Sequence, residues 1–171
     1  MRSFFRHFIV FLIAFLLQQE TQAQKVENGG YQVQNKATGL VLRPFDARGE
    51  EGTPIVVYPQ TTWRCMTWEL KSLKDSGVYR FQNYFTGKTF TSTEWREGGS
   101  VVETSLDRKG GLTGWKIVPA GDGYYRIEAA ASDWVLTVEG EGVNAKVVVK
   151  KWTKQATQLW KLLPKPERFT G

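Results

Sequence analysis

The residues of this 171-residue chain that are best suited to contact a ligand are aromatic and basic side chains. Tyr58 and Trp63 fall close together, and Lys150, Lys151 and Trp152 place an indole ring directly beside two cations. A ring can stack on the apolar face of a ligand, while a neighbouring cation attracts an anionic group. These patterns favour ligand binding.

Most catalytic and metal-binding arrangements are excluded by composition. The chain has one histidine, His7, and one cysteine, Cys65. His7 lies in the N-terminal segment that we expect to be removed, which excludes Ser-His-Asp and Cys-His catalysis and a His-based zinc site. A single cysteine is too few for a Cys-based zinc site or for a disulfide within the chain. Residues 140–145 match the Gly-x-Gly-x-x-Ala dinucleotide pattern but lead into a predicted strand, not a helix. We expect no enzyme activity and no cofactor. We predict that Cys65 is a partly buried small hydrophobic residue, with intermolecular pairing as the alternative.

The first 23 residues have the layout of a secretory signal peptide. Arg2 and Arg6 give a positive start, residues 8–17 are apolar, and Thr21 and Ala23 provide small residues before a cleavage point. A membrane span needs about 20 apolar residues, roughly twice this length. We therefore expect cleavage after Ala23 and export to the periplasm, cell surface or extracellular space. We expect no membrane span after that cleavage.

Two markers repeat along the rest of the chain with one period. The opening tyrosines, at spacings of 48 and 46 residues, are Tyr31, Tyr79 and Tyr125. The closing tryptophans, at spacings of 47 and 45 residues, are Trp68, Trp115 and Trp160. We place three repeats at about 30–73, 77–119 and 123–163, in one domain of residues 24–163. The Pro-rich residues 164–171 are predicted to be an extended or disordered tail.

Each repeat has the pattern of four short strands separated by turns. Residues 79–82 alternate apolar and polar, as a half-buried strand does, and no stretch keeps the apolar period of a helix. Twelve strands in three units indicate an all-β fold. Three blades cannot close a propeller, whereas a β-trefoil uses all twelve strands and leaves no free edge. The sequence therefore predicts a β-trefoil.

The seven tryptophans divide into two groups. The three that close the repeats are predicted to lie in the core, together with Phe81, Phe90, Ile127 and Leu136. Trp63, Trp95, Trp134 and Trp152 fall on predicted loops or strand ends. We expect some of these four to cap the barrel, since Trp is highly buried on average, and the others to form a binding platform.

The three repeats resemble the ricin B-type (Gln-x-Trp) lectin family, whose fold is the β-trefoil. The ending that defines the family is present as Gln-Leu-Trp at 158–160 and in altered form at 66–68 and 113–115. Its Asn-x-x-Ser/Thr-Gly turn is matched at 35–39 and 83–87. The resemblance covers about residues 30–163 and implies a carbohydrate-binding protein.

The resemblance also indicates which positions would contact a sugar. Sugar-binding repeats of the family have an Asp just after the second strand, and here Arg43, Thr91 and Thr137 hold that position. The aromatic residue on the third strand is retained as Tyr58 and replaced by Thr104 and Lys150. The candidate carbohydrate-binding residues are Arg43, Tyr58, Trp63, Asn144, Lys150, Lys151 and Trp152.

Charge is distributed unevenly along the predicted mature chain. Residues 24–145 carry a net charge of −1, whereas residues 146–171 carry +6. The main hypothesis is a secreted lectin-like module that binds glycans in shallow loop sites of the first and third repeats. One alternative is an anionic polysaccharide bound by the basic third repeat, and another is a trefoil that has lost sugar binding and binds a protein partner. We expect no nucleic-acid partner, because we expect the chain to be exported and its sequence has no nucleic-acid-binding module.

Overall fold

The computed structural model describes residues 25–73, 77–107 and 113–170, so the predicted signal peptide lies outside the described residues. No helix in these ranges is long and apolar enough to cross a membrane. The strands are β1 (Gly29–Asn35), β2 (Val41–Pro44), β3 (Ile55–Tyr58), β4 (Trp68–Leu73), β5 (Val78–Asn83), β6 (Thr89–Ser92), β7 (Gly99–Thr104), β8 (Trp115–Pro119), β9 (Tyr125–Ala129), β10 (Trp134–Glu139), β11 (Lys146–Lys151) and β12 (Trp160–Pro164). The 3₁₀ turns are η1 (Phe45–Ala47), η2 (Arg64–Met66) and η3 (Ala156–Gln158).

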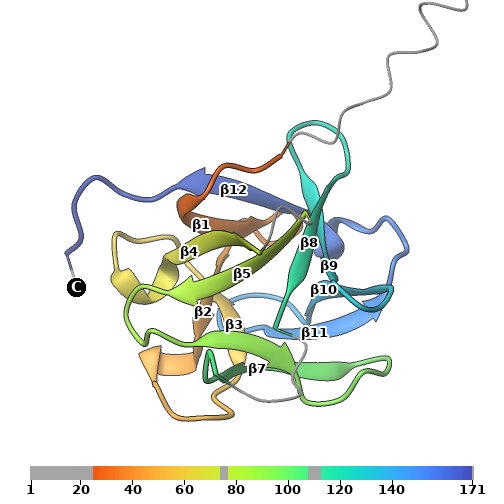
Figure 1. Ribbon diagram of the computed structural model, residues 1–171, viewed down its shortest axis with the longest axis horizontal. Coiled ribbons are helices and arrows are strands. Elements are labelled where there is room, and N and C mark those ends of the chain that lie inside the picture. The colour runs from red at the N-terminus through yellow and green to blue at the C-terminus, as the bar shows by residue number, and fades with distance from the viewer. Residues whose placement is uncertain (1–24, 74–76, 108–112, 171) are drawn as a thin grey trace, which may run out of the picture.

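Six strands close into an antiparallel barrel. β1 pairs with β4 and β12, β5 pairs with β4 and β8, and β9 pairs with β8 and β12. The other six strands form the hairpins β2–β3, β6–β7 and β10–β11, which cover the lower end of the barrel in Figure 1. This arrangement is a β-trefoil, and barrel closure removes the free edges that would otherwise pair with other chains. The predicted all-β fold of three four-strand repeats is confirmed.

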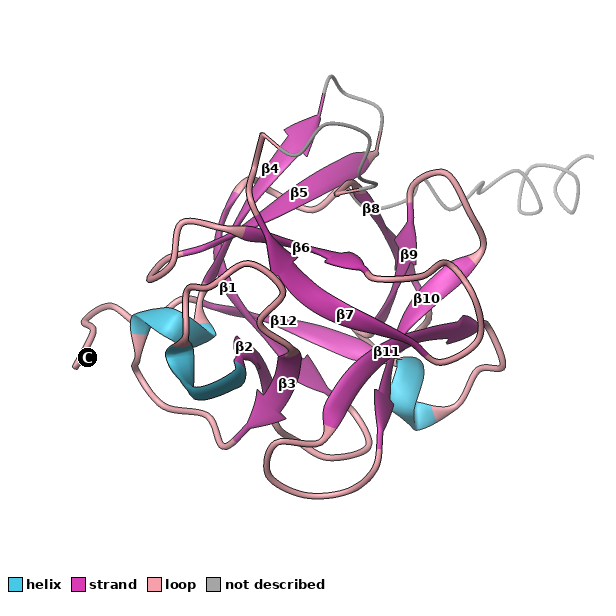
Figure 2. Ribbon diagram, turned by 90° about the horizontal axis from the view of Figure 1, so that it is seen from below, coloured by secondary structure: helices cyan, strands magenta, loops and turns pink. Residues whose placement is uncertain are grey.

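The capping hairpins are joined to one another in a ring, which Figure 2 shows from the hairpin end. The loop of each hairpin bonds to the third strand of another repeat, and the three equivalent backbone hydrogen bonds run from Asn144 N–H to Val57 O (2.9 Å), from Gly52 N–H to Glu103 O (3.0 Å) and from Gly98 N–H to Val149 O (2.9 Å). Any site built beside a third strand therefore contains residues from two repeats.

The repeat-closing tryptophans link the barrel to its cap. Trp68, Trp115 and Trp160 are fully buried. Each indole N–H donates to a carbonyl in the hairpin of its own repeat, at Leu42 (3.1 Å), Phe90 (3.5 Å) and Leu136 (3.0 Å). A ring of this size fills the core, and its single donor satisfies a buried carbonyl group. The predicted core residues Phe81, Phe90, Ile127 and Leu136 are also fully buried.

The Asn-x-x-Thr-Gly segments form identical turns in the first two repeats. Asn83 Oδ1 accepts hydrogen bonds from the backbone N–H groups of Phe85 (3.0 Å) and Thr86 (3.1 Å). Gly87 has a φ of +69°, a left-handed conformation that glycine adopts without steric cost. The Asn83 amide also donates to Cys65 O at 2.9 Å, so the turn fastens the second repeat to the first.

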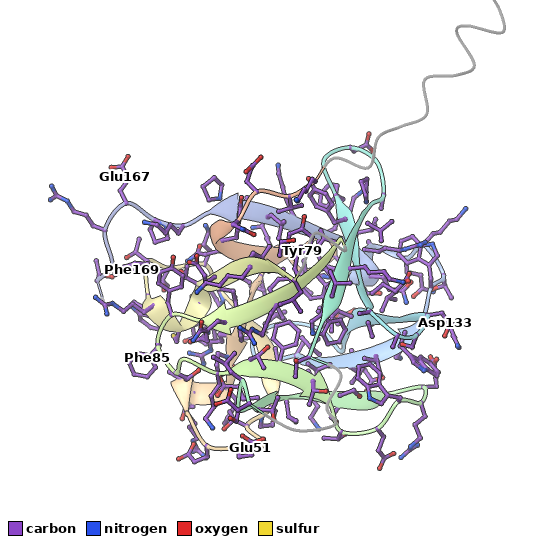
Figure 3. All side chains as sticks on the ribbon, in the orientation of Figure 1. Glu51, Tyr79, Phe85, Asp133, Glu167 and Phe169 are labelled. Carbon is purple, nitrogen blue, oxygen red and sulfur yellow. The ribbon has the colours of Figure 1, made fainter. Side chains whose placement is uncertain are left out.

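The C-terminal segment returns to the first repeat. Lys165 N–H donates to Gly30 O at 2.9 Å, and Thr170 N–H donates to the carbonyl of residue 62 at 3.2 Å. The ring of Phe169 lies 5.7 Å from the ring of Tyr84, and the Arg64 guanidinium lies 5.7 Å from the Phe169 ring centroid. Figure 3 shows Phe169 against this side of the molecule. The tail, which we expected to be extended or disordered, is docked on the fold.

Candidate functional site

Four of the seven predicted site residues meet at one place, which we call the first-repeat cluster: Arg43 in β2, Tyr58 at the end of β3, Trp63 in the following loop and Asn144 in the β10–β11 loop. The guanidinium carbon of Arg43 lies 3.6 Å from the Tyr58 ring centroid, and Arg43 Nη2 donates to Asn144 Oδ1 at 3.4 Å. The Tyr58 and Trp63 rings stack at a centroid distance of 6.3 Å and an angle of 28°.

The β2–β3 pairing and the adjacent hairpin loop bring this cluster together. Arg43 faces Val56 and Val41 faces Tyr58 in the β2–β3 register, so the Arg43 and Tyr58 side chains are diagonal neighbours on one face. Asn144 has a φ of +64°, and its backbone N–H donates to Val57 O at 2.9 Å. Asn visits this left-handed conformation more readily than most residues. The third repeat thereby supplies a polar group to the first.

Hydrogen bonds brace the loop that carries Trp63. The Trp63 N–H donates to Thr61 Oγ1 at 3.3 Å, and Gln32 Nε2 donates to Thr61 O at 2.7 Å. Gln60 Nε2 in turn donates to Gln32 Oε1 at 2.8 Å, and Gln32 is buried. The Trp63 side chain therefore stands on a fixed loop. Sequence analysis missed Gln32 because it lies in β1, where nothing in its spacing relates it to residues 60–63.

The first-repeat cluster contains a buried positive charge. Arg43 is only 5% exposed, and its Nε is buried without a hydrogen-bond partner. Within residues 25–73, 77–107 and 113–170, no carboxylate forms an ion pair with it. The nearby Cys65, which we predicted to be partly buried, is a buried free thiol, and burial raises its pKa despite the Arg43 charge. The thiol is therefore neutral near pH 7 and does not compensate the guanidinium.

Trp63 is the ring of the cluster that a ligand can reach. The Arg43 guanidinium covers one face of Tyr58, whereas Trp63 is 36% exposed. Trp95 and Trp134 pack against the core, and the Trp95 ring lies 6.0 Å from that of Trp115. Of the four tryptophans predicted at loops or strand ends, these two cap the barrel.

The predicted basic residues of β11 are paired with carboxylates. Lys150 Nζ lies 2.8 Å from Glu139 Oε2, and Lys151 pairs with Asp133 while its Nζ lies 4.1 Å from the Trp134 ring centroid. Figure 3 shows Asp133 on the opposite side of the molecule from Phe169. These pairs reduce the local positive charge that the sequence indicates.

The seven predicted residues do not form one site. Lys146 begins β11 and faces Val56 of β3, whereas Lys151 ends the strand. Five residues of extended strand separate the two ends of β11 by about 17 Å. Lys150, Lys151 and Trp152 therefore lie away from the first-repeat cluster.

Trp152 borders a separate cavity of about 320 Å³. The Arg126 guanidinium lies 5.4 Å from the Trp152 ring centroid and pairs with Glu128 at 3.2 Å. The cavity is lined by Pro119, Ala120, Arg126, Trp152, Lys154 and Leu159. Sequence analysis did not place Arg126 at a site, because nothing in the pattern of its strand indicates that it lies beside Trp152, 26 residues later.

Comparison with protein-family models identifies the class of the protein. The ricin-type beta-trefoil lectin domain-like family matches residues 18–105 and, in a second overlapping match, residues 64–152. The two matches are offset by about one repeat, as expected of a chain built from similar units. The chain belongs to this family. Comparison with curated protein sequences gives no significant match.

Solved structures agree with this assignment. The designed three-fold symmetric protein ThreeFoil is 26% identical, with a TM-score of 0.74, over 80% of this chain and 99% of its own. The Rhizoctonia solani agglutinin is 24% identical, with a TM-score of 0.74, over 81% and 96%. The Macrolepiota procera ricin B-like lectin, solved in complex with lactose, is 15% identical, with a TM-score of 0.69, over 82% and 99%.

Proposed function

We propose that this protein is an exported, non-catalytic carbohydrate-binding module and that the first-repeat cluster is its site. The observation that carries the proposal is the Trp63 ring, 36% exposed on a braced loop beside the polar groups of Arg43 and Asn144. A sugar has an apolar face that can stack on such a ring and hydroxyl groups that can bond to the neighbouring side chains. Membership of a lectin-domain family supports the same function.

Binding at this cluster would be shallow. The sugar would stack on Trp63, and the Asn144 amide and Arg43 would bond to its oxygen atoms. Tyr58 would act mainly by holding Arg43, since its ring already carries the guanidinium at 3.6 Å. Few contacts on an open surface give modest affinity for a single sugar, so multivalent glycans would bind more strongly than monosaccharides.

The cavity beside Trp152 is a second candidate sugar site. It combines an aromatic ring with the cations Arg126 and Lys154 around a volume of about 320 Å³. Arg126 pairs with Glu128, whereas no ion pair among the described residues involves Lys154. Glycan binding by the third repeat, including anionic polysaccharide, would therefore use Lys154 and the Trp152 ring of this cavity more readily than Lys150 and Lys151, which have carboxylate partners.

A protein-binding trefoil is the candidate function of a different class. It is favoured by the second and third repeats, where the position of the family's sugar-binding Asp is held by Thr91 and Thr137. Both side chains are buried, and the Thr137 hydroxyl already bonds to Gln158 Nε2 at 3.2 Å and to Val135 O at 3.1 Å. These two positions offer a sugar no free group.

A glycan-array screen of the protein at low and at physiological salt tests these functions. Binding that is lost in W63A but kept in W152A would support the first-repeat site. Binding lost only in W152A would move the function to the third-repeat cavity. Silence across the array would contradict the carbohydrate-binding proposal and favour the protein-binding function.

A further inference from the structure

The charge on Arg43 is the feature of the first-repeat cluster that sugar hydroxyl groups do not explain. A guanidinium cannot lose its proton in a protein, and a buried charge is normally paired with an opposite charge. Arg43 is 5% exposed, and its partners in the described part of the chain are uncharged: the Tyr58 ring, the Asn144 amide and the Cys65 thiol. A contact with an aromatic ring offsets only part of the cost of burying a cation, less than a carboxylate partner would.

We propose that the first-repeat cluster binds an anionic sugar, one carrying a carboxylate or sulfate group, which pairs with Arg43 while the sugar ring stacks on Trp63. This inference rests on the proposed function, because it names the ligand class of the same site. The planar guanidinium presents parallel N–H donors that match the paired oxygens of such a group. Sugar-binding repeats of the family have an Asp at the position of Arg43. This site therefore carries a positive charge where those repeats carry a negative one.

The existing contact between Arg43 and Asn144 can be exchanged for a ligand contact. The distance from Nη2 to Oδ1 is 3.4 Å, longer than the usual range of about 2.7–3.2 Å for an N–H···O bond. A charge-assisted bond to a carboxylate or sulfate is shorter and stronger. The Asn144 amide also has N–H donors, which can bond to the same anionic group once its side chain turns.

Other cations of the molecule are less suited to this role. Lys150 and Lys151 pair with Glu139 and Asp133, and Arg48 lies 3.8 Å from Asp46 on an exposed surface. Surface ion pairs of this kind are strongly hydrated and contribute little to specific recognition. Arg43 combines burial, an aromatic partner and an adjacent exposed ring. Arg43 is therefore better suited to an anionic ligand than Lys150 and Lys151, the third-repeat residues to which the sequence directed that alternative.

The test uses an array that carries uronic-acid, sialylated, sulfated and neutral glycans, followed by calorimetry. The calorimetric probes are a short oligogalacturonate and its uncharged methyl ester, which differ only in the acidic group, and a sulfated galactose oligosaccharide. We expect the wild-type protein to bind at least one anionic probe at least tenfold more tightly than the uncharged ester. Binding of carboxylated but not sulfated probes, or the reverse, would identify the anionic group.

Variants of Arg43 locate the anionic contact. R43M should reduce the affinity for the anionic probe at least tenfold, whereas R48M, in the same repeat, should leave it unchanged. R43K keeps the charge without the two-pronged donor geometry and should retain an intermediate affinity. The thermal unfolding midpoint of each variant checks that it is folded, and R43K gives a second test if R43M does not fold.

Three results would overturn the inference. Binding of neutral glycans only, or equal affinity for the acid and its ester, would remove the anionic ligand but leave the proposed function intact. Anionic binding that survives in R43M would place the contact elsewhere. Failure to bind any glycan would contradict both the inference and the proposed function.

Discussion

The hydroxyl group of Thr86 donates a 2.5 Å hydrogen bond to the carboxyl group of Glu103, which is fully buried. By the backbone contacts of its strand, Glu103 takes the place that Val57 holds in the first repeat and Val149 holds in the third. Its second oxygen, Oε2, is buried without a hydrogen-bond partner. The three-fold core therefore has a carboxyl group at one of three equivalent apolar positions.

Burial raises the pKa of Glu103 from 4.5 to about 7. The hydrogen bond from Thr86 and the charge of Lys88 lower this pKa, and the charges of Glu51 and Glu50 raise it, but desolvation is the largest cause. A folded state with a raised carboxyl pKa binds the proton more tightly than the unfolded state does. The contribution of Glu103 to stability is therefore present below pH 4.5 and is lost as the pH rises through about 7.

The first prediction is that the free energy of unfolding falls as the pH rises from 5 to 8. The loss assigned to Glu103 is at most about 3 kcal/mol, because one pKa unit corresponds to about 1.4 kcal/mol. E103Q mimics the protonated carboxyl group and should remove this dependence, so that the variant is more stable than wild type at pH 8. Chemical denaturation at both pH values measures the effect.

A matched control for E103Q is E141Q, because Glu141 is exposed in the β10–β11 loop. This variant should keep the wild-type pH profile. An unchanged pH profile in E103Q would show that the Glu103 carboxyl group is ionised throughout the range and is stabilised by groups other than Thr86.

The period of the sequence was sufficient to predict the fold. Trp68, Trp115 and Trp160 recur because each fills the core and donates to a hairpin carbonyl, so the spacing of a single residue type reports the repeat. Residues 99–104 of β7 do not alternate, and Val101, Val102, Glu103 and Thr104 are all buried. The sequence pattern of β7 therefore does not reveal that the Glu103 carboxyl group lies in the core.

The candidate site was predictable in its residue types but only in part in its arrangement. Tyr58 and Trp63 are near in sequence, so their stacking follows from one loop. The contact between Arg43 and Asn144 joins residues 101 positions apart and depends on how the hairpins of two repeats meet. The pairing of Lys151 with Asp133 depends on the β10–β11 register, which turns an apparent basic cluster into ion pairs.

The second prediction concerns the closing tryptophan of the third repeat. W160F removes the indole N–H that bonds to Leu136 O at 3.0 Å and leaves that carbonyl buried. It also leaves a cavity in a core position that is fully buried. The unsatisfied Leu136 carbonyl group and the cavity together should lower the free energy of unfolding by about 2–4 kcal/mol. Denaturant titration would show this, and a loss under 1 kcal/mol would mean that the core repacks around the smaller ring.

The third prediction is that R43M does not destabilise the protein. The substitution removes a buried charge that has no carboxylate partner in the described residues and places an apolar side chain of similar length over Tyr58. Because burying an uncompensated charge is unfavourable, we expect the free energy of unfolding to rise by about 1 kcal/mol. A fall of 2 kcal/mol or more would indicate that the guanidinium is stabilised within the fold and has a structural role. Thermal and denaturant unfolding of wild type, R43M and R48M would decide this.

The fourth prediction separates the stacking role of Trp63 from a general effect of removing an exposed ring. Trp63 is 36% exposed in the first-repeat cluster, whereas Phe85 is 58% exposed in the turn of the second repeat. W63A should weaken glycan binding at least tenfold, equivalent to about 1.4 kcal/mol, because the sugar loses the surface on which it stacks. F85A should bind glycans as the wild-type protein does.

Both rings are partly in solvent, so neither variant should lose more than about 1 kcal/mol of stability. Equal affinity of W63A and F85A in a glycan titration followed by calorimetry would remove the first-repeat cluster as the sugar site.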